Sequence, residues 1–178
     1  QLVKDLDAGP VYRSMTVPIG ETTTAGELLD ELAQTATPLV TQTLEDIDSG
    51  IEPTPQSSEG VTTAPQIHPG DVRIDLTAPA EEIDHLVRGT SPTPGAWAEL
   101  DDKRFKVLRT CHLGPDATVP DTVTTAQPGQ LVATRKQLFL GTGSRPLELL
   151  QVQAFGKKAM NGADWARGAG IDAGTRLR

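Results

Sequence analysis

The strongest constraint on this chain is the stretch from Asp48 to Gly60, in which proline, glycine and serine replace any apolar periodicity. Such a composition is typical of a linker. The charge also changes across it, because residues 1–67 carry two basic and eleven acidic residues, whereas residues 103–178 carry twelve basic and five acidic ones. This asymmetry is typical of two modules with different partners, and a basic module often binds phosphates. We predict a domain over residues 1–47, a linker over 48–67 and a second domain over 68–178.

The first domain is predicted to contain one strand and one helix. Residues 10–19 favour a strand, because Val11, Met15 and Val17 are apolar and the turn-forming segment Pro18-Ile19-Gly20 closes the stretch. Leucine, valine and isoleucine then recur at three- and four-residue spacings over residues 28–47, which predicts a helix with an interruption at Pro38. We interpret this pair as the terminal strand and helix of a doubly wound α/β domain. The chain opens at Gln1 rather than Met, so we expect it to be a piece of a longer protein.

The second domain is predicted to be a small barrel with flanking helices, so the whole chain is of the mixed α+β class. A short helix is expected after Thr77-Ala78-Pro79, and a closing helix is expected to begin at Asn161 with Trp165 on its inner face. Between the helices, alternating or clustered apolar residues bounded by turn residues predict five or six short strands. The main candidates are residues 96–100, 104–110, 131–134, 137–142 and 147–153.

Several function classes find no support in the sequence. The apolar runs are far shorter than the roughly 20 residues of a membrane-spanning helix. Cys111 is the only cysteine, and no secretory signal opens the chain, so we expect a protein of the reducing cytoplasm. Glu81 and His85 lie one helical turn apart without further ligands, so no metal site is predicted. The segment Gly141-Thr142-Gly143-Ser144 lacks the lysine of a phosphate loop and is interpreted as a hairpin turn.

Asp7 lies in a tight turn immediately before the predicted strand. A carboxylate held there could orient an imidazole or accept a proton while the backbone stays rigid. An ordinary turn explains the same residues, because aspartate before a small residue and Gly9 is common turn chemistry. The residues by themselves leave both interpretations open.

Several short blocks of residues are distributed along the whole chain. They are Leu6-Asp7-Ala8-Gly9-Pro10-Val11, Val17-Pro18-Ile19, Thr24-Ala25-Gly26-Glu27-Leu28, Pro53-Thr54-Pro55-Gln56, Thr63-Ala64-Pro65, Arg73-Ile74-Asp75, Ser91-Pro92-Thr93-Pro94-Gly95-Ala96-Trp97 and Gly156-Lys157-Lys158-Ala159-Met160. Together these blocks resemble the methionyl-tRNA formyltransferase family, in the order and spacing of that family. The last block, which follows the last predicted strand, is the most specific one.

The resemblance implies transfer of a formyl group from 10-formyltetrahydrofolate to the amino group of methionine on initiator tRNA. It implies that Asp7 is the catalytic aspartate, which holds a histidine and its water in place. The family's catalytic Asn and His have no counterpart here, so we expect the chain alone to be inactive. We also expect it to be monomeric.

The resemblance further implies that the second domain is an OB-like barrel that binds the tRNA. Basic side chains on or beside its strands are the expected phosphate contacts. These candidates are Lys103, Arg104, Lys106, Arg109, Arg135, Lys136, Lys157 and Lys158. The six aromatic residues argue against a base-stacking platform, and Trp97 is expected in the core.

Two alternatives remain open at this point. A formyl-sugar transferase or a formyltetrahydrofolate hydrolase-like enzyme would share the two-domain plan. A stand-alone, non-catalytic RNA-binding module would explain why the catalytic residues are incomplete.

Overall fold

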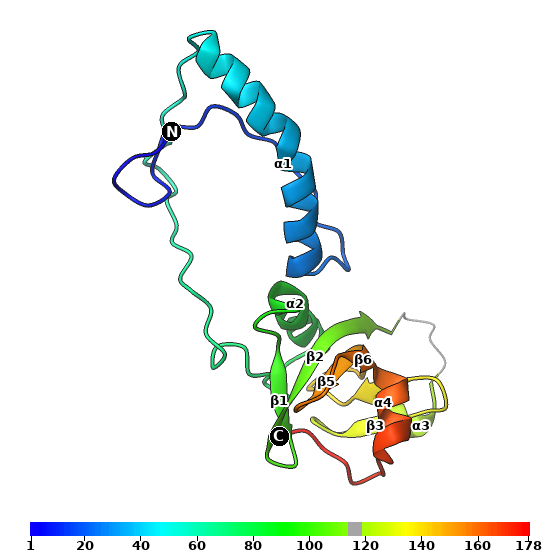
Figure 1. Ribbon diagram of the computed structural model, residues 1–178. Coiled ribbons are helices and arrows are strands. Elements are labelled where there is room, and N and C mark those ends of the chain that lie inside the picture. The colour runs from blue at the N-terminus through cyan, green and yellow to red at the C-terminus, as the bar shows by residue number, and fades with distance from the viewer. Residues whose placement is uncertain (114–118) are drawn as a thin grey trace. The chain divides into compact units, whose positions relative to one another are not determined.

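The computed structural model describes residues 1–113 and 119–178, which form two compact units. The first unit comprises residues 1–21 and 27–66, and the second comprises residues 22–26 and 67–178. Figure 1 shows the course of the chain through its helices and strands.

The first unit is built around helix α1 (Ala25–Asp48). This helix continues through Pro38, so the predicted interruption is wrong. Pro38 lacks one backbone hydrogen-bond donor, but the helical turns on either side of it keep their own donors. On the same unit, Arg13 donates to Asp46 near the end of the helix, with 2.8 Å between Nη2 and Oδ1. This ion pair ties the segment before the helix to the last turn of α1.

The strand predicted over residues 10–19 does not form. Only Val11 pairs, in an isolated antiparallel bridge with Thr54, whose two N–H···O bonds measure 2.8 and 2.9 Å. A strand needs a neighbouring strand to satisfy its backbone groups, and the described residues of this unit provide only that one bridge. The apolar pattern of residues 10–19 therefore does not suffice for a strand here, and the prediction is wrong.

The second unit is a curled antiparallel half-barrel, and all five segments predicted as strands are confirmed. Among the described residues, the strands follow the order β1-β2-β5-β4-β3, and β6 pairs with β5. Their bounds are β1 (Trp97–Leu100), β2 (Lys103–His112), β3 (Leu131–Ala133), β4 (Leu138–Leu140), β5 (Leu147–Ala154) and β6 (Met160–Asn161).

A segment after the last helix connects the two outer strands of this sheet. Arg178 exchanges both backbone hydrogen bonds with Glu99 of β1, at 2.7 and 2.8 Å. On the other side, the N–H of Leu131 in β3 donates to Thr175, and the N–H of Leu177 donates to Gly129. Gly129 is required there, because its φ is +83° and a Cβ would lie 2.6 Å from the Leu177 oxygen. Residues 175–178 therefore bridge the opening of the half-barrel.

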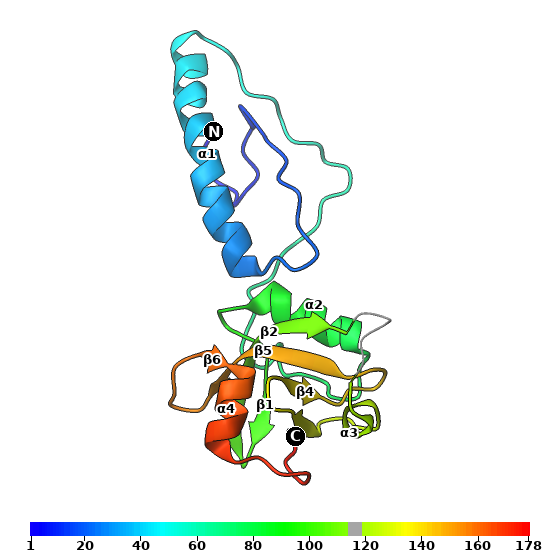
Figure 2. The same ribbon diagram turned by 90° about the vertical axis from the view of Figure 1, so that its right-hand side faces the viewer.

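Within the described part of this unit, three helices accompany the sheet, namely α2 (Ala80–Thr90), α3 (Asp121–Thr124) and α4 (Gly162–Ala169). Helix α2 lies against β2, as Figure 2 shows. Helix α4 begins as predicted, because the Asn161 side chain accepts hydrogen bonds from the N–H groups of Ala163 and Asp164. No helix in the described part of the chain is long and apolar enough to cross a bilayer.

The core of the second unit lies between the sheet and helices α2 and α4. Side chains from the centre of the sheet are fully buried, and Ile83 and Val87 of α2 pack against them. Trp165 of α4 lies on Phe105 of β2, with 4.6 Å between ring centroids, so it faces inward as predicted. Each fully buried large apolar side chain stabilises the fold by roughly 1.5–3 kcal/mol. This core holds the sheet rigid beneath the charged residues at its ends.

Candidate functional site

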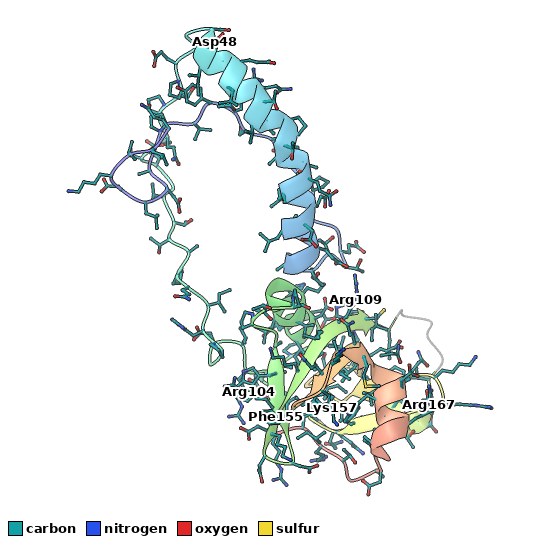
Figure 3. The ribbon with its side chains drawn as sticks, viewed as in Figure 1. Asp48, Arg104, Arg109, Phe155, Lys157 and Arg167 are labelled. Atoms are coloured by element: carbon teal, nitrogen blue, oxygen red, sulfur yellow. The ribbon has the colours of Figure 1, made fainter. Side chains whose placement is uncertain are left out.

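The register of β2 and β5 brings two pairs of basic residues to one end of the sheet. Phe105 lies opposite Ala154 in this antiparallel pair. Residues that precede Phe105 therefore lie beside residues that follow Ala154. Lys103, Arg104, Lys157 and Lys158 consequently share this end of the sheet, and all four are exposed. We call these four residues the basic end, and Figure 3 labels Arg104 and Lys157 within it.

The turn that presents the two lysines is well defined. Gly156 has a φ of +69°, a conformation that favours glycine. The N–H of Lys157 donates to Ala154 at 3.0 Å, and the side chain of Gln153 donates to the Lys157 carbonyl at 2.8 Å. The chain then returns as β6, so Lys157 and Lys158 lie in the connection of a hairpin.

Arg104 is positioned by an aromatic neighbour. Its guanidinium carbon lies 4.4 Å from the centroid of the Trp97 ring, and Arg73 lies 5.4 Å from the same centroid. A cation held over the face of an indole ring keeps its charge while losing freedom of movement. Trp97 is buried, and its Nε1–H donates to the Pro69 carbonyl at 2.6 Å, so its predicted core position is confirmed. Sequence reasoning missed Arg73. It lies beside this group because its backbone forms an isolated parallel β-bridge with Trp97.

Arg135 and Lys136 form a second basic group in the turn between β3 and β4. Both side chains are exposed. Arg167 of α4 joins them, because its Nη1 donates to the Arg135 carbonyl at 3.2 Å. The sequence pattern did not single out Arg167, since its place depends on how α4 packs against β3 and β4.

The two remaining basic candidates lie within β2 and are half-buried. The ammonium of Lys106 donates to the Pro94 carbonyl at 2.7 Å, so part of its bonding capacity serves a neighbouring loop. Arg109 lies opposite Gln151, where the β2/β5 register is irregular. The exposed candidates of the basic end and of the β3–β4 turn are therefore better placed to meet phosphates.

Asp7 lies in the first unit, in the turn that the sequence predicted. Its side chain is exposed, and its φ of +54° lies in the left-handed region that aspartate tolerates better than most residues. The side-chain amide of Gln56 donates to the carbonyls of Asp7 and Gly9, at 2.8 and 2.7 Å. Residues 1–66 contain neither histidine nor asparagine. The first unit thus fixes the backbone around one carboxylate without an acid or base partner for it.

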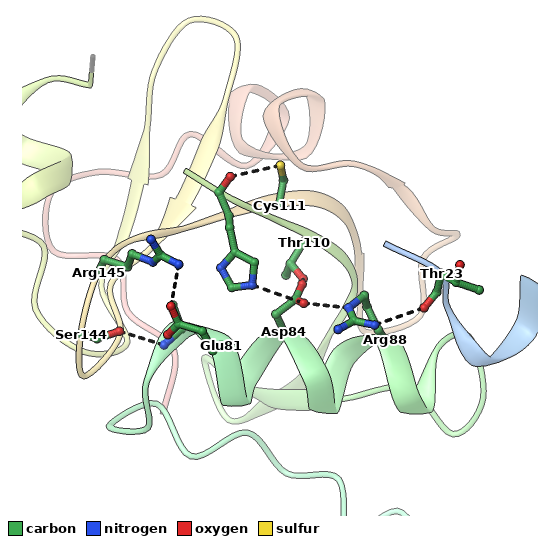
Figure 4. A network of polar contacts seen from close by, with 10 residues as sticks. Thr23, Glu81, Asp84, Arg88, Thr110, Cys111, Ser144 and Arg145 are labelled. Atoms are coloured by element: carbon green, nitrogen blue, oxygen red, sulfur yellow. Dashed lines mark hydrogen bonds and ion pairs between the residues drawn. The ribbon is translucent and has the colours of Figure 1, made fainter. Parts of the chain in front are cut away.

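Asp84 forms a buried polar network that joins α2 to β2 (Figure 4). Its carboxylate accepts hydrogen bonds from Arg88 at 2.7 Å and from the Thr110 hydroxyl at 2.5 Å, and the His112 Nε2 lies 3.4 Å away. Burial opposes ionisation of Asp84, but the hydrogen bonds from Arg88 and Thr110 outweigh it, so its pKa is lowered. The bond from Thr110 joins the helix to the strand and the bond from Arg88 lies within the helix, so we assign the network a structural role.

The first turn of α2 is fixed in a similar way. The Ser144 hydroxyl accepts a hydrogen bond from the Ala80 N–H at 3.0 Å, and Arg145 pairs with Glu81 at 2.5 Å. The segment Gly141–Ser144 therefore belongs to the connection between β4 and β5, as expected for a hairpin turn. Within the described residues, no three histidine, cysteine or acidic side chains cluster in a way that could hold a metal ion.

Comparison with known proteins gives a consistent picture. Residues 66–170 match the family model of the formyl transferase C-terminal domain. The chain is 79% identical over its whole length to the methionyl-tRNA formyltransferase of Cutibacterium acnes, of which it covers 56%. It is 46% identical over 99% of its length to the enzyme of the same name from Thermobifida fusca, of which it covers 55%. The chain thus spans about half the length of these curated relatives.

Solved structures of low sequence identity share the fold. HypX from Aquifex aeolicus, in a multiply substituted variant, matches 96% of this chain with a TM-score of 0.73 and 18% identity, and the match covers 30% of HypX. A second HypX structure, in complex with tetrahydrofolic acid, matches 92% of this chain with a TM-score of 0.72 and 18% identity, covering 28% of HypX.

Proposed function

Because the chain belongs to the formyl transferase family through its C-terminal domain, we propose that it serves as the C-terminal part of a methionyl-tRNA formyltransferase that acts in translation initiation. The observation that carries this proposal is the 79% identity, over the whole chain, to a relative of that name. The corresponding activity belongs to the cytoplasm, where translation starts, and we expect the protein to act as a monomer.

The proposed reaction moves a formyl group from 10-formyltetrahydrofolate to methionine on initiator tRNA. The methionine nitrogen attacks the formyl carbon, a new C–N bond forms, and the bond from that carbon to the folate nitrogen breaks. The attacking amine loses a proton and the departing folate nitrogen gains one, so tetrahydrofolate and formylmethionyl-tRNA result. The reaction therefore needs donors for the developing oxyanion and a group that carries the proton.

Asp7 is the residue of this chain that we assign to the chemistry. In the family pattern an aspartate orients a histidine, and that histidine works with an asparagine on the formyl donor. Residues 1–66 contain neither of these two types, so the donor site requires residues beyond this unit. The Gln56 hydrogen bonds suit the assignment, since an orienting carboxylate needs a rigid backbone.

We assign residues 1–47 to the formyl-transferring domain and residues 48–67 to the linker. Exposed apolar side chains on α1 support this assignment, because Leu29, Val40 and Leu44 are 66%, 60% and 63% exposed within their unit. Apolar residues at helical spacing normally pack against neighbouring elements of a domain. Residues 68–178 then form the tRNA-binding domain, with the basic end and the β3–β4 turn as phosphate contacts.

A salt titration tests the tRNA contacts. Each phosphate contact should contribute about 0.7 to 0.9 to the slope of log affinity against log salt. We expect Lys158→Ala to weaken binding of initiator tRNA and to lower this slope by about one contact. Lys4→Ala is the matched control, because it removes the same charge from an exposed position of the first unit. Equal slopes for Lys158→Ala and the parent chain would refute the assignment.

A chimera tests the catalytic part of the proposal. In this chimera, the 178-residue chain is substituted for the region that it matches in the Cutibacterium acnes relative. Formylation of methionyl-tRNA is then measured with 10-formyltetrahydrofolate as the donor. We expect activity in the chimera and none in the 178-residue chain alone. Asp7→Asn should lower kcat by about 100-fold or more with little change in KM for tRNA. Asp5→Asn, two residues earlier, should leave kcat unchanged.

The stand-alone RNA-binding alternative has one observation in its favour. The basic end and the sheet that carries it lie entirely within residues 67–178, which form their own core. If the chimera is inactive while the chain still binds tRNA with a steep salt dependence, the binding module is the better description.

A further inference from the structure

Phe155 is an apolar side chain without an evident packing role. It is 68% exposed, more than any other large apolar residue described in the second unit. It follows β5 directly and precedes Gly156, so it lies at the root of the turn that carries Lys157 and Lys158. Figure 3 labels Phe155 between Arg104 and Lys157.

A shallow hollow of about 200 Å³ adjoins Phe155. Phe105 and Trp165, whose rings contact each other in a tilted arrangement in the core, contribute to its wall. Lys103 and Arg104 line it together with Phe155, so two cations of the basic end lie beside an aromatic surface. Asp101 is the acidic residue of the lining. The combination suits a flat apolar group that is attached to negative charge.

We propose that Phe155 stacks on one unpaired base of the bound RNA while the basic end contacts the phosphates on either side of that base. This inference rests on the proposed tRNA binding and adds a specific contact to it. Unpaired bases expose their faces and stack on aromatic side chains regardless of sequence, whereas bases inside a duplex are covered by their neighbours. One exposed ring serves one base, which agrees with the low aromatic content of the chain.

The test compares Phe155 variants of the whole chain on two RNA probes. The first probe is initiator tRNA, which has unpaired bases, and the second is a blunt RNA duplex with the same number of phosphates. Removing one stacking contact should weaken binding of the tRNA by roughly 5- to 150-fold. We expect this loss for Phe155→Ala and most of it for Phe155→Leu, which keeps apolar bulk without a ring. Phe155→Tyr should bind like the parent.

The salt slope separates this inference from the proposed function. Phe155→Ala should leave the slope on tRNA unchanged, because no phosphate contact is lost, and should leave duplex affinity unchanged. If Phe155→Ala binds tRNA as well as the parent while Lys158→Ala loses affinity and slope, the stacking contact is refuted and the phosphate contacts stand. If Phe155→Ala weakens both probes equally, the stacking contact is also refuted. Thermal unfolding of each variant verifies that the exposed substitution leaves the fold intact.

Discussion

At the scale of single residues, Asp84 shows how a buried charge is tolerated in this protein. Its side chain is 5% exposed, and removing a carboxylate from water is unfavourable unless hydrogen bonds replace the water. Arg88 and Thr110 supply those bonds, from the same helix and from β2 respectively. The network therefore links two elements through one ionised group, and its contribution depends on pH.

Asp84→Asn should destabilise the second unit by roughly 1.5–3 kcal/mol at pH 7, because it removes charged hydrogen bonds. The pKa of Asp84 is lowered in the folded protein, so its contribution is complete above the unfolded pKa and is lost as pH falls through the folded one. Urea unfolding of both proteins from pH 7 to pH 3 measures this. The difference between the two free energies should narrow toward the acid end. Glu82→Gln, an exposed change on the same helix, should have little effect at any pH.

Only part of the candidate site could be predicted from the sequence. Lys157 and Lys158 follow a glycine in the sequence, and that local signal was enough to place them on a turn. Their proximity to Lys103 and Arg104 depends on the register of two strands that are about fifty residues apart, which no local pattern encodes. Phe155 could have been noticed as an aromatic residue directly before the Gly-Lys-Lys turn.

At the scale of elements, the strands of the second unit were predictable because each carries its own apolar pattern and is bounded by turn residues. The α4 cap was predictable because Asn161 hydrogen-bonds to its own helix. The strand predicted over residues 10–19 does not form, because β-pairing requires a partner strand that the segment itself does not contain. The predicted interruption at Pro38 is absent because the remaining turns of helix α1, which spans 24 residues, outweigh the local cost of the proline.

Pro38→Ala should stabilise helix α1 by up to about 3 kcal/mol, because alanine restores the missing N–H donor and removes the clash of the proline ring. Hydrogen exchange of the amides of α1 is the appropriate measurement, since it reports on this helix separately from the half-barrel. We expect slower exchange on both sides of position 38. Exchange rates equal to those of the parent would mean that tertiary contacts, rather than the helix itself, determine its opening.

At the scale of the whole molecule, the half-barrel depends on a contact between residues that are distant in sequence. Residues 175–178 pair with β1 at Glu99 and with the region of β3 at Gly129 and Leu131. Leu177 is 3% exposed and belongs to the core cluster. Closure of the sheet and burial of apolar surface are therefore achieved by the same short segment.

Leu177→Ala should destabilise the second unit by about 2–5 kcal/mol, the range for truncating a buried leucine. Arg176→Ala is the control, because its side chain is exposed while its backbone keeps the pairing with Gln130. Thermal unfolding monitored by the fluorescence of Trp97 and Trp165 measures both variants. Similar midpoints for the two would show that the backbone pairing, rather than Leu177, holds the segment.

The position of this closing segment has a consequence for synthesis. All six described strands are synthesised before residues 175–178, so the outer edges of β1 and β3 stay unpaired during that interval. Unpaired strand edges are the usual starting points for intermolecular association. A nascent chain is therefore most prone to aggregate in the interval before residues 175–178 emerge, and slow translation of the codons for that segment would lengthen the exposure.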